Sequence, residues 1–163
     1  QVSRNMTAQA ASSMGIHGYA MPGDPVLPKA VRAFLSDIAH SPGATEPVYH
    51  GFESKRPIEF QVGDTMRMPL TATSSSREVA EMYSDRRGVI LEFERGTPIH
   101  VYMSVKSARE VGGEPDFNLA YAEALTAGEF KVTRVKAGRG PTVVTLKATA
   151  VFDPSSKKWV PHG

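Results

Sequence analysis

Glycine and proline are frequent in this chain, and their frequency limits which folds the sequence can form. The 163 residues include 14 Gly and 12 Pro, so about one residue in six interrupts regular backbone structure. Long helices are therefore not expected, whereas many short strands joined by turns are. Hydrophobic residues make up 40% of the chain and charged residues 22%, which is a globular composition of a size suited to one domain.

Turn residues and hydrophobic periodicity divide the chain into two parts. Residues 1–25 are rich in Ser, Ala, Gly and Met without a sustained period, so we expect a flexible arm or linker there. Residues 26–163 are interpreted as a single domain. Its first expected element is a helix at about 28–40, because apolar residues recur with helical spacing at Val31, Phe34, Leu35 and Ile38.

The rest of the domain has the alternation of β-structure, with one more short helix. That helix is expected at 77–83, with a serine as its N-cap and Glu78 within capping-box reach of Ser75. Gly128 is expected to turn the chain between two strands. Strands are expected at 47–52, 68–73, 88–94, 98–103, 119–125, 130–135 and 142–152. Strands outnumber helices and the helices come early, which predicts an α+β fold.

Charge is distributed unevenly along the chain, although the net charge is only +2. Residues 131–163 contain seven Lys and Arg residues and one acid, Asp153, whereas residues 1–130 carry a net negative charge. A basic end is typical of a surface that meets nucleic acid or an acidic protein. The alternative is a set of solvated strand faces, which is favoured because no aromatic series is interleaved with the cations.

Several kinds of chemistry find no support in the residues present. The chain has no cysteine, which excludes disulfide scaffolds, cysteine-ligated zinc and thiol catalysis. Its five histidines are scattered, with no pair at metal-ligand spacing, so no metal is expected. The apolar runs are too short for a transmembrane helix, and no membrane partner is expected. The chain begins with Gln1 and shows no signal peptide, so we expect a piece of a larger polypeptide.

Three features are candidates for a functional site. His50 lies near the end of an expected strand, just before Gly51. Hydroxyl residues fill much of 71–76 at a strand-to-helix junction, and Glu123 lies on an apolar stretch. Each feature has a structural alternative: a histidine with satisfied hydrogen bonds, a helix cap, or a solvated strand residue. Their order along the chain favours a common site.

This ordered set resembles the ADP-ribosyltransferase superfamily. The matching segments are residues 48–51, 71–83 and 121–132. The family pattern contains a Tyr-His-Gly strand, a Ser-Thr-Ser strand that enters a helix, and a catalytic Glu before a glycine-containing turn. The resemblance covers roughly residues 47–136. It implies an α+β split β-sandwich of two small sheets around an NAD cleft, with short helices mainly in the N-terminal half.

The resemblance also implies a role for each matched residue. Glu123 is the expected catalytic carboxylate, which would stabilise the oxocarbenium-like ribosyl cation formed when NAD loses nicotinamide. Tyr121 is expected to contact the acceptor. Glu129 is a rival for the catalytic carboxylate, but it is expected to be exposed on the far side of the turn at Gly128. Ala72 stands where the family has its first serine. The residues expected to bind NAD are His50, Gly51, Thr73, Ser74, Ser75 and Tyr83; a core-facing position is the alternative for Tyr83.

Under this resemblance the chain is a mono-ADP-ribosyltransferase that transfers ADP-ribose from NAD, its co-substrate, to a macromolecular acceptor, either protein or nucleic acid. It would be a toxin or effector domain, secreted or delivered into a target cell, with an immunity or inhibitor protein as a further partner. Two alternatives stay open. Ala72 and Tyr121 could mark an inactive NAD-binding or interaction module of the same fold, or the chain could be an unrelated basic β domain that binds nucleic acid.

Overall fold

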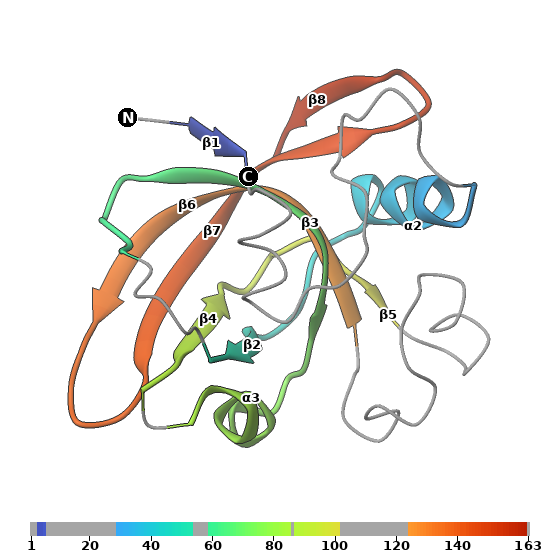
Figure 1. Cartoon of the computed structure of the whole chain (residues 1–163). Helices are drawn as coiled ribbons and strands as arrows, with labels where there is room; N and C mark the ends of the chain where they lie inside the picture. The colour runs from blue at the N-terminus through green and yellow to red at the C-terminus, as the bar shows by residue number, and fades with distance from the viewer. Residues whose placement is uncertain (1–2, 6–28, 54–58, 86, 102–123, 163) are drawn as a thin grey trace.

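The secondary structure of the computed structural model confirms the α+β prediction (Figure 1). The structure describes residues 3–5, 29–53, 59–85, 87–101 and 124–162. The helices in this part of the chain are α2 (Lys29–Ala39) and α3 (Arg77–Ser84). The strands are β1 (Ser3–Asn5), β2 (Val48–Phe52), β3 (Thr65–Thr73), β4 (Val89–Phe93), β5 (His100–Val101), β6 (Ala124–Lys136), β7 (Thr142–Asp153) and β8 (Lys158–Pro161).

The strands pair into one mixed sheet with the order β1-β3-β6-β7-β4-β2, to which β5 adds beside β6 and β8 beside β7. The β1–β3 and β4–β7 pairs are parallel, and the other pairs are antiparallel. The long β6–β7 hairpin joins β3 on one side to β4 and β2 on the other (Figure 1). Register shifts interrupt this hairpin twice, and such bulges bend strands. The two small sheets expected from the resemblance are thus joined into one sheet through β6 and β7.

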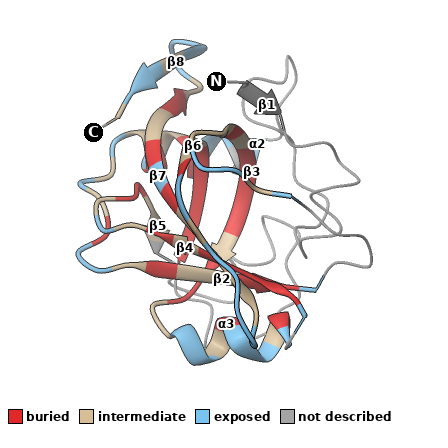
Figure 2. Ribbon diagram, turned by 90° about the vertical axis from the view of Figure 1, so that its left-hand side faces the viewer, coloured by how far each residue is buried: buried red, intermediate tan, exposed pale blue. Residues whose placement is uncertain are grey.

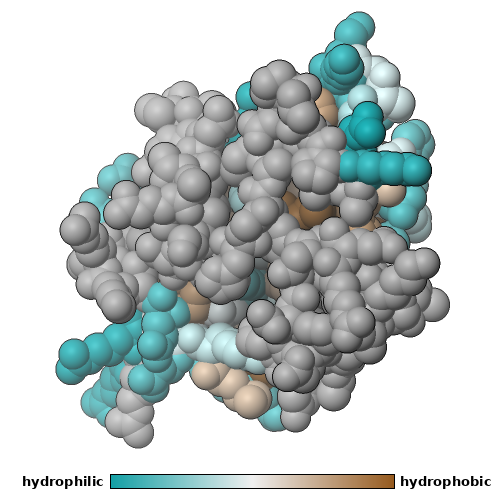
Figure 3. Space-filling model, turned by 45° about the vertical axis from the view of Figure 1, so that its right-hand side comes forward, coloured by the Kyte–Doolittle hydropathy of each residue, from teal (hydrophilic) through white to brown (hydrophobic). Residues whose placement is uncertain are grey.

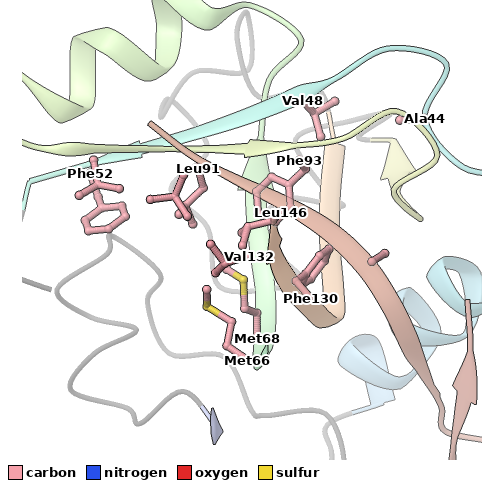
Figure 4. Close-up of a cluster of buried hydrophobic side chains, with 13 residues drawn as sticks. Ala44, Val48, Phe52, Met66, Met68, Leu91, Phe93, Phe130, Val132 and Leu146 are labelled. Atoms are coloured by element: carbon pink, nitrogen blue, oxygen red, sulfur yellow. The ribbon is translucent and has the colours of Figure 1, made fainter. Parts of the chain in front are cut away.

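One hydrophobic core lies between β3, β6 and β7 and the strands β4 and β2 (Figure 4). Phe93 and Phe130 meet edge to face at its centre, with their ring centroids 5.0 Å apart, and both are fully buried. Edge-to-face packing adds to the free energy gained by burying the rings. The strands that contribute to this core carry the alternating apolar residues on which the strand predictions depended.

A second core lies under α2, which packs against β5, β6 and β7. Phe34, Leu35 and Ile38 of the predicted helical stripe are buried there, so this helix prediction is confirmed. They pack with Leu70, Leu125, Ala127, Val151 and Phe152. Figure 2 shows the buried residues along β3, β6 and β7 and the exposed outer side of α3 and β8.

A bulge in β3 decides which core each of its side chains enters. Met68 pairs with Gly128 and Thr71 with Thr126, so β3 has one residue more than β6 in this stretch. The extra stretch contains Pro69, which has no N–H for the ladder and is tolerated in strands at such bulges. Met68 therefore packs in the first core and Leu70 in the core under α2.

Gly128 and Ser3–Asn5 lie in strands, where the sequence predicted a turn and a flexible arm. Gly128 does not turn the chain, because β6 runs through it without interruption. Its φ is 143°, and a Cβ there would lie 2.7 Å from the carbonyl oxygen of Ala150, so the glycine permits close approach of β7. In the segment expected to be a flexible arm, Ser3–Asn5 forms β1 and pairs in parallel with the start of β3.

Candidate functional site

The end of β3 is attached to β2 by an isolated bridge between Tyr49 and Ser74. The Tyr49 N–H donates to the Ser74 carbonyl at 2.8 Å, and the Ser74 N–H donates to the Tyr49 carbonyl at 3.0 Å. This bridge brings the Tyr-His-Gly strand and the hydroxyl-rich junction side by side. Two of the three segments that resemble the ADP-ribosyltransferase pattern therefore meet in space.

His50 adds a second connection between the same segments. Its Nδ1 lies 2.8 Å from the carbonyl oxygen of Ala72. A carbonyl can only accept a hydrogen bond, so Nδ1 carries the proton and the ring orientation is set. Val48 and Phe52, on either side of His50 along β2, belong to the first core, so strand alternation turns His50 toward the same face of the sheet.

Thr73 connects this junction to the start of β6. The Thr73 side chain is buried, and its hydroxyl donates to the carbonyl oxygen of Ala124 at 3.1 Å. Ala124 is also the Cα partner of Thr73 in the sheet, and in the sequence it directly follows Glu123. Glu123 and Tyr121 themselves lie outside the described residues, so their catalytic and acceptor-contacting roles stay predictions.

The serines after Thr73 form the entry to α3, though differently from the expected capping box. The N-cap residue is Ser76 rather than Ser75, and its side chain makes no capping hydrogen bond. Instead the buried Ser74 hydroxyl accepts a hydrogen bond from the Ser76 N–H at 3.1 Å. Ser75 is half-buried at this turn. The Ser75–Glu78 capping box is therefore wrong, because the N-cap is Ser76 and Glu78 lies only two residues after it.

Gly51 lies where β2 packs against α3. A Cβ at Gly51 would lie 1.8 Å from the carbonyl oxygen of Ala80, which is incompatible with this packing. The glycine therefore has a structural role that sequence reasoning missed, since nothing local in the sequence reveals that a helix crosses this strand. Tyr83, further along α3, is half-buried. The NAD-binding roles assigned to Gly51 and Tyr83 stay predictions.

Glu129, the rival carboxylate, is already engaged by other side chains. Its Oε2 lies 3.1 Å from Nε of Arg67, and its Oε1 accepts a hydrogen bond from the Thr149 hydroxyl at 3.1 Å. Arg67 in turn stacks over Trp159, with 4.3 Å between the guanidinium carbon and the ring centroid. Glu129 thus joins β3, β6 and β7 rather than facing away from them beyond a turn.

Tyr49 is a further functional candidate that the sequence did not single out on its own. Burial raises the pKa of the Tyr49 phenol above its ordinary value, and the nearby Glu92 carboxylate raises it further. Glu92 is the cross-strand partner of Tyr49 and accepts a hydrogen bond from the Thr145 hydroxyl at 3.1 Å. The phenol therefore keeps its proton to a higher pH than a solvated tyrosine does.

Neither a metal site nor a membrane-spanning helix is found in the described ranges. Within them, no three His, Cys, Asp or Glu side chains gather in a way that could hold a metal ion. Neither α2 nor α3 is long and apolar enough to cross a membrane. On the face shown in Figure 3, the described residues that reach the surface are mainly hydrophilic.

No protein-family model matches the chain, and no curated protein is similar to it in sequence. Among solved structures it is similar to Vis toxin, an ADP-ribosyltransferase from Vibrio splendidus, at 18% identity and a TM-score of 0.45, over 73% of this chain and 58% of that one. The complex of Vis with the M6 inhibitor gives 18% identity, a TM-score of 0.44, and 73% and 59% coverage. The complex of Vis with agmatine gives 18% identity and a TM-score of 0.43, over 72% of this chain and 54% of that one. The chain thus spans less than two thirds of the length of each of these structures.

Proposed function

We propose that this chain is a mono-ADP-ribosyltransferase that uses NAD as its co-substrate. The observation that carries the proposal is the meeting of the motif segments where the end of β3 lies beside β2. His50 binds the Ala72 carbonyl, Tyr49 bridges to Ser74, and Thr73 binds the carbonyl of Ala124, the residue after Glu123. Segments far apart in the sequence are thereby joined by hydrogen bonds at one place.

The residue types at this junction suit a ligand that is rich in hydroxyl, amide and phosphate groups. His50 and the hydroxyls of Thr73, Ser74 and Ser75 offer donors and acceptors, and Tyr83 offers an aromatic face for stacking on nicotinamide. Ala72 has no hydroxyl, and its methyl group packs against the core under α2. In this proposal Thr73 replaces that hydroxyl, because it binds the backbone immediately after Glu123.

In the proposed reaction, the bond between the ribose C1′ and the nicotinamide nitrogen breaks, and its electron pair leaves with nicotinamide. Positive charge develops on the ribosyl group, and the Glu123 carboxylate stabilises it electrostatically. A lone pair of the acceptor then forms the new bond to C1′, and the acceptor group releases a proton.

The acceptor in this proposal is a protein or a nucleic acid. We also propose that the chain acts as a toxin or effector that is delivered into a target cell, and that an immunity protein inhibits it.

Nicotinamide release from NAD tests the proposal directly. We expect the native chain to release nicotinamide, and Glu123→Gln to lower turnover by roughly two to three orders of magnitude, the scale for removing a key electrostatic group. NAD affinity should be nearly unchanged, because the carboxylate acts mainly in the transition state. Thermal protection by millimolar NAD reports that affinity independently of turnover.

Glu129→Gln is the matched control, since it makes the same chemical change a short distance further along the chain. Its ion pair with Arg67 is partly exposed, with side-chain exposures of 34% and 21%, so its loss should cost at most about 1 kcal/mol of stability. Turnover per folded molecule should therefore be unchanged. Activity that collapses in Glu129→Gln and persists in Glu123→Gln would overturn the assignment. Absence of both NAD protection and nicotinamide release would reject the function.

A further inference from the structure

A cavity of about 410 Å³ lies between the turn that follows β4, the middle of β7 and the C-terminal segment. Its volume falls within the range of small-molecule sites. None of its lining residues belongs to the proposed NAD site, which is formed by the junction of β2, β3 and α3. The lining residues are Pro42, Glu94, Arg95, Gly96, Thr97, Lys147, Ala148 and His162.

One wall of the cavity is a well-braced turn. The Thr97 N–H donates to the Glu94 carbonyl at 3.1 Å, and Gly96 has a φ of 95°, which glycine adopts easily. The Gly96 N–H donates to the Ala44 carbonyl at 2.8 Å, and the Ala44 N–H donates to the Thr97 carbonyl at 2.8 Å. A Cβ at Gly43 would lie 2.6 Å from the Gly96 carbonyl oxygen, so the two loops pack without space between them.

The C-terminal segment is attached to the same turn. Nε2 of His162 lies 2.8 Å from the carbonyl oxygen of Gly96, so Nε2 carries a proton and donates. The His162 N–H donates to the carbonyl of Thr149 on β7 at 2.9 Å. Three separate parts of the chain are thus held in fixed positions around the cavity, which lowers the entropy cost of ordering a ligand site there.

The charges around the cavity favour an anion. Arg95 and Lys147 are exposed cations, and within the described residues neither forms an ion pair. Among the described residues that line the cavity, Glu94 is the only carboxylate, and it accepts a hydrogen bond from the Thr133 hydroxyl at 3.0 Å. Lys147 also lies directly across the sheet from Lys131, and like charges in that arrangement are destabilising. An anion at the mouth of the cavity would offset this repulsion.

We propose that this cavity is a second ligand site, which binds a small molecule through a phosphate group. Arg95 and Lys147 supply charge-assisted hydrogen bonds to the phosphate oxygens, as these side chains commonly do. Pro42 and Ala148 supply an apolar wall for the organic part of a phosphate ester. The site would bind its ligand independently of NAD.

Amide NMR titration with inorganic phosphate and with phenyl phosphate, against chloride at equal ionic strength, tests this site. In the native chain we expect saturable shifts at the Gly96 and Thr97 amides with both probes. Tighter binding of phenyl phosphate would identify a phosphate ester as the ligand, and equal binding would identify free phosphate. An Arg95→Gln/Lys147→Gln double variant should bind at least about tenfold more weakly, because two charged contacts are lost.

An Arg134→Gln/Lys136→Gln double variant is the matched control. It removes one arginine and one lysine charge from β6, at residues that do not line the cavity. Its affinity for both phosphate probes should equal that of the native chain. Equal weakening in both variants would reduce the effect to nonspecific electrostatics and overturn the proposal. Shifts that do not saturate in millimolar phosphate would overturn it as well. Neither result bears on NAD binding, which is measured separately.

Discussion

Replacing Gly51 by alanine should destabilise the protein through a single contact between β2 and α3. The added Cβ would lie 1.8 Å from the Ala80 carbonyl oxygen, whereas ordinary contact begins at 3.4 Å. Strand and helix must therefore separate by about 1.6 Å. Because the obstructing atom belongs to the backbone, no side-chain rotation can relieve the clash. This separation weakens the packing of α3 against β2.

The magnitude follows from two opposing effects. Overpacking of a buried site costs about 3 kcal/mol at the upper end of its usual range. Alanine restricts the unfolded chain more than glycine does, which returns about 0.4–1 kcal/mol. We therefore expect a net loss of about 2 kcal/mol in the free energy of unfolding. With a urea m-value of about 2 kcal/mol/M, the unfolding midpoint should fall by about 1 M.

Urea unfolding followed by circular dichroism measures this loss, and Gly138→Ala provides the matched control. Gly138 is exposed, a Cβ added to it would meet no atom within 4 Å, and its φ is not positive. Its replacement should leave the midpoint unchanged or raise it slightly. If Gly51→Ala and Gly138→Ala unfold at the same urea concentration, the close packing of α3 on β2 is refuted.

Two further predictions concern ionisable side chains of the junction. His50→Ala should raise the Michaelis constant for NAD by an amount corresponding to about 1–3 kcal/mol and change turnover little, because the His50 ring is held by the Ala72 carbonyl and is expected to contact the far ribose. The control is His40→Ala, at an exposed residue just after α2. An unchanged Michaelis constant in His50→Ala would remove that residue from the site. Burial and Glu92 raise the pKa of Tyr49, so the folded state holds this proton more tightly than the unfolded state. The stability that this difference contributes is fully present below pH 10 and declines as the pH rises above that value. Tyr49→Phe should therefore flatten the decline in the free energy of unfolding, measured by urea unfolding above pH 10. An identical pH slope in the native chain and the variant would contradict this prediction.

Local sequence patterns determined most of the secondary structure. The apolar stripe of Phe34, Leu35 and Ile38 predicted α2 within a residue or two, because helical periodicity is a property of neighbouring residues. Alternation likewise predicted β2, β4 and β7. The order of the Tyr-His-Gly and hydroxyl-rich segments predicted that they would share a site, and the Tyr49–Ser74 bridge joins them.

Contacts between distant segments were decided only by the tertiary structure. Gly128 looked like a turn residue, yet the approach of Ala150 on β7 requires it within a strand. Glu129 looked like an exposed residue beyond that turn, yet Arg67 and Thr149 hold it. Neither partner is a sequence neighbour, and no local pattern encodes which strands will become adjacent.

The cavity beside the turn after β4 shows the same limit most clearly. Its walls come from Pro42, the turn at 94–97, Lys147 and His162, which are separated by most of the length of the domain. The sequence by itself determined that cations would be concentrated after residue 130. Strand pairing decided that Lys147 would lie beside Arg95 and His162, because long-range packing brings together residues that carry no common local signal.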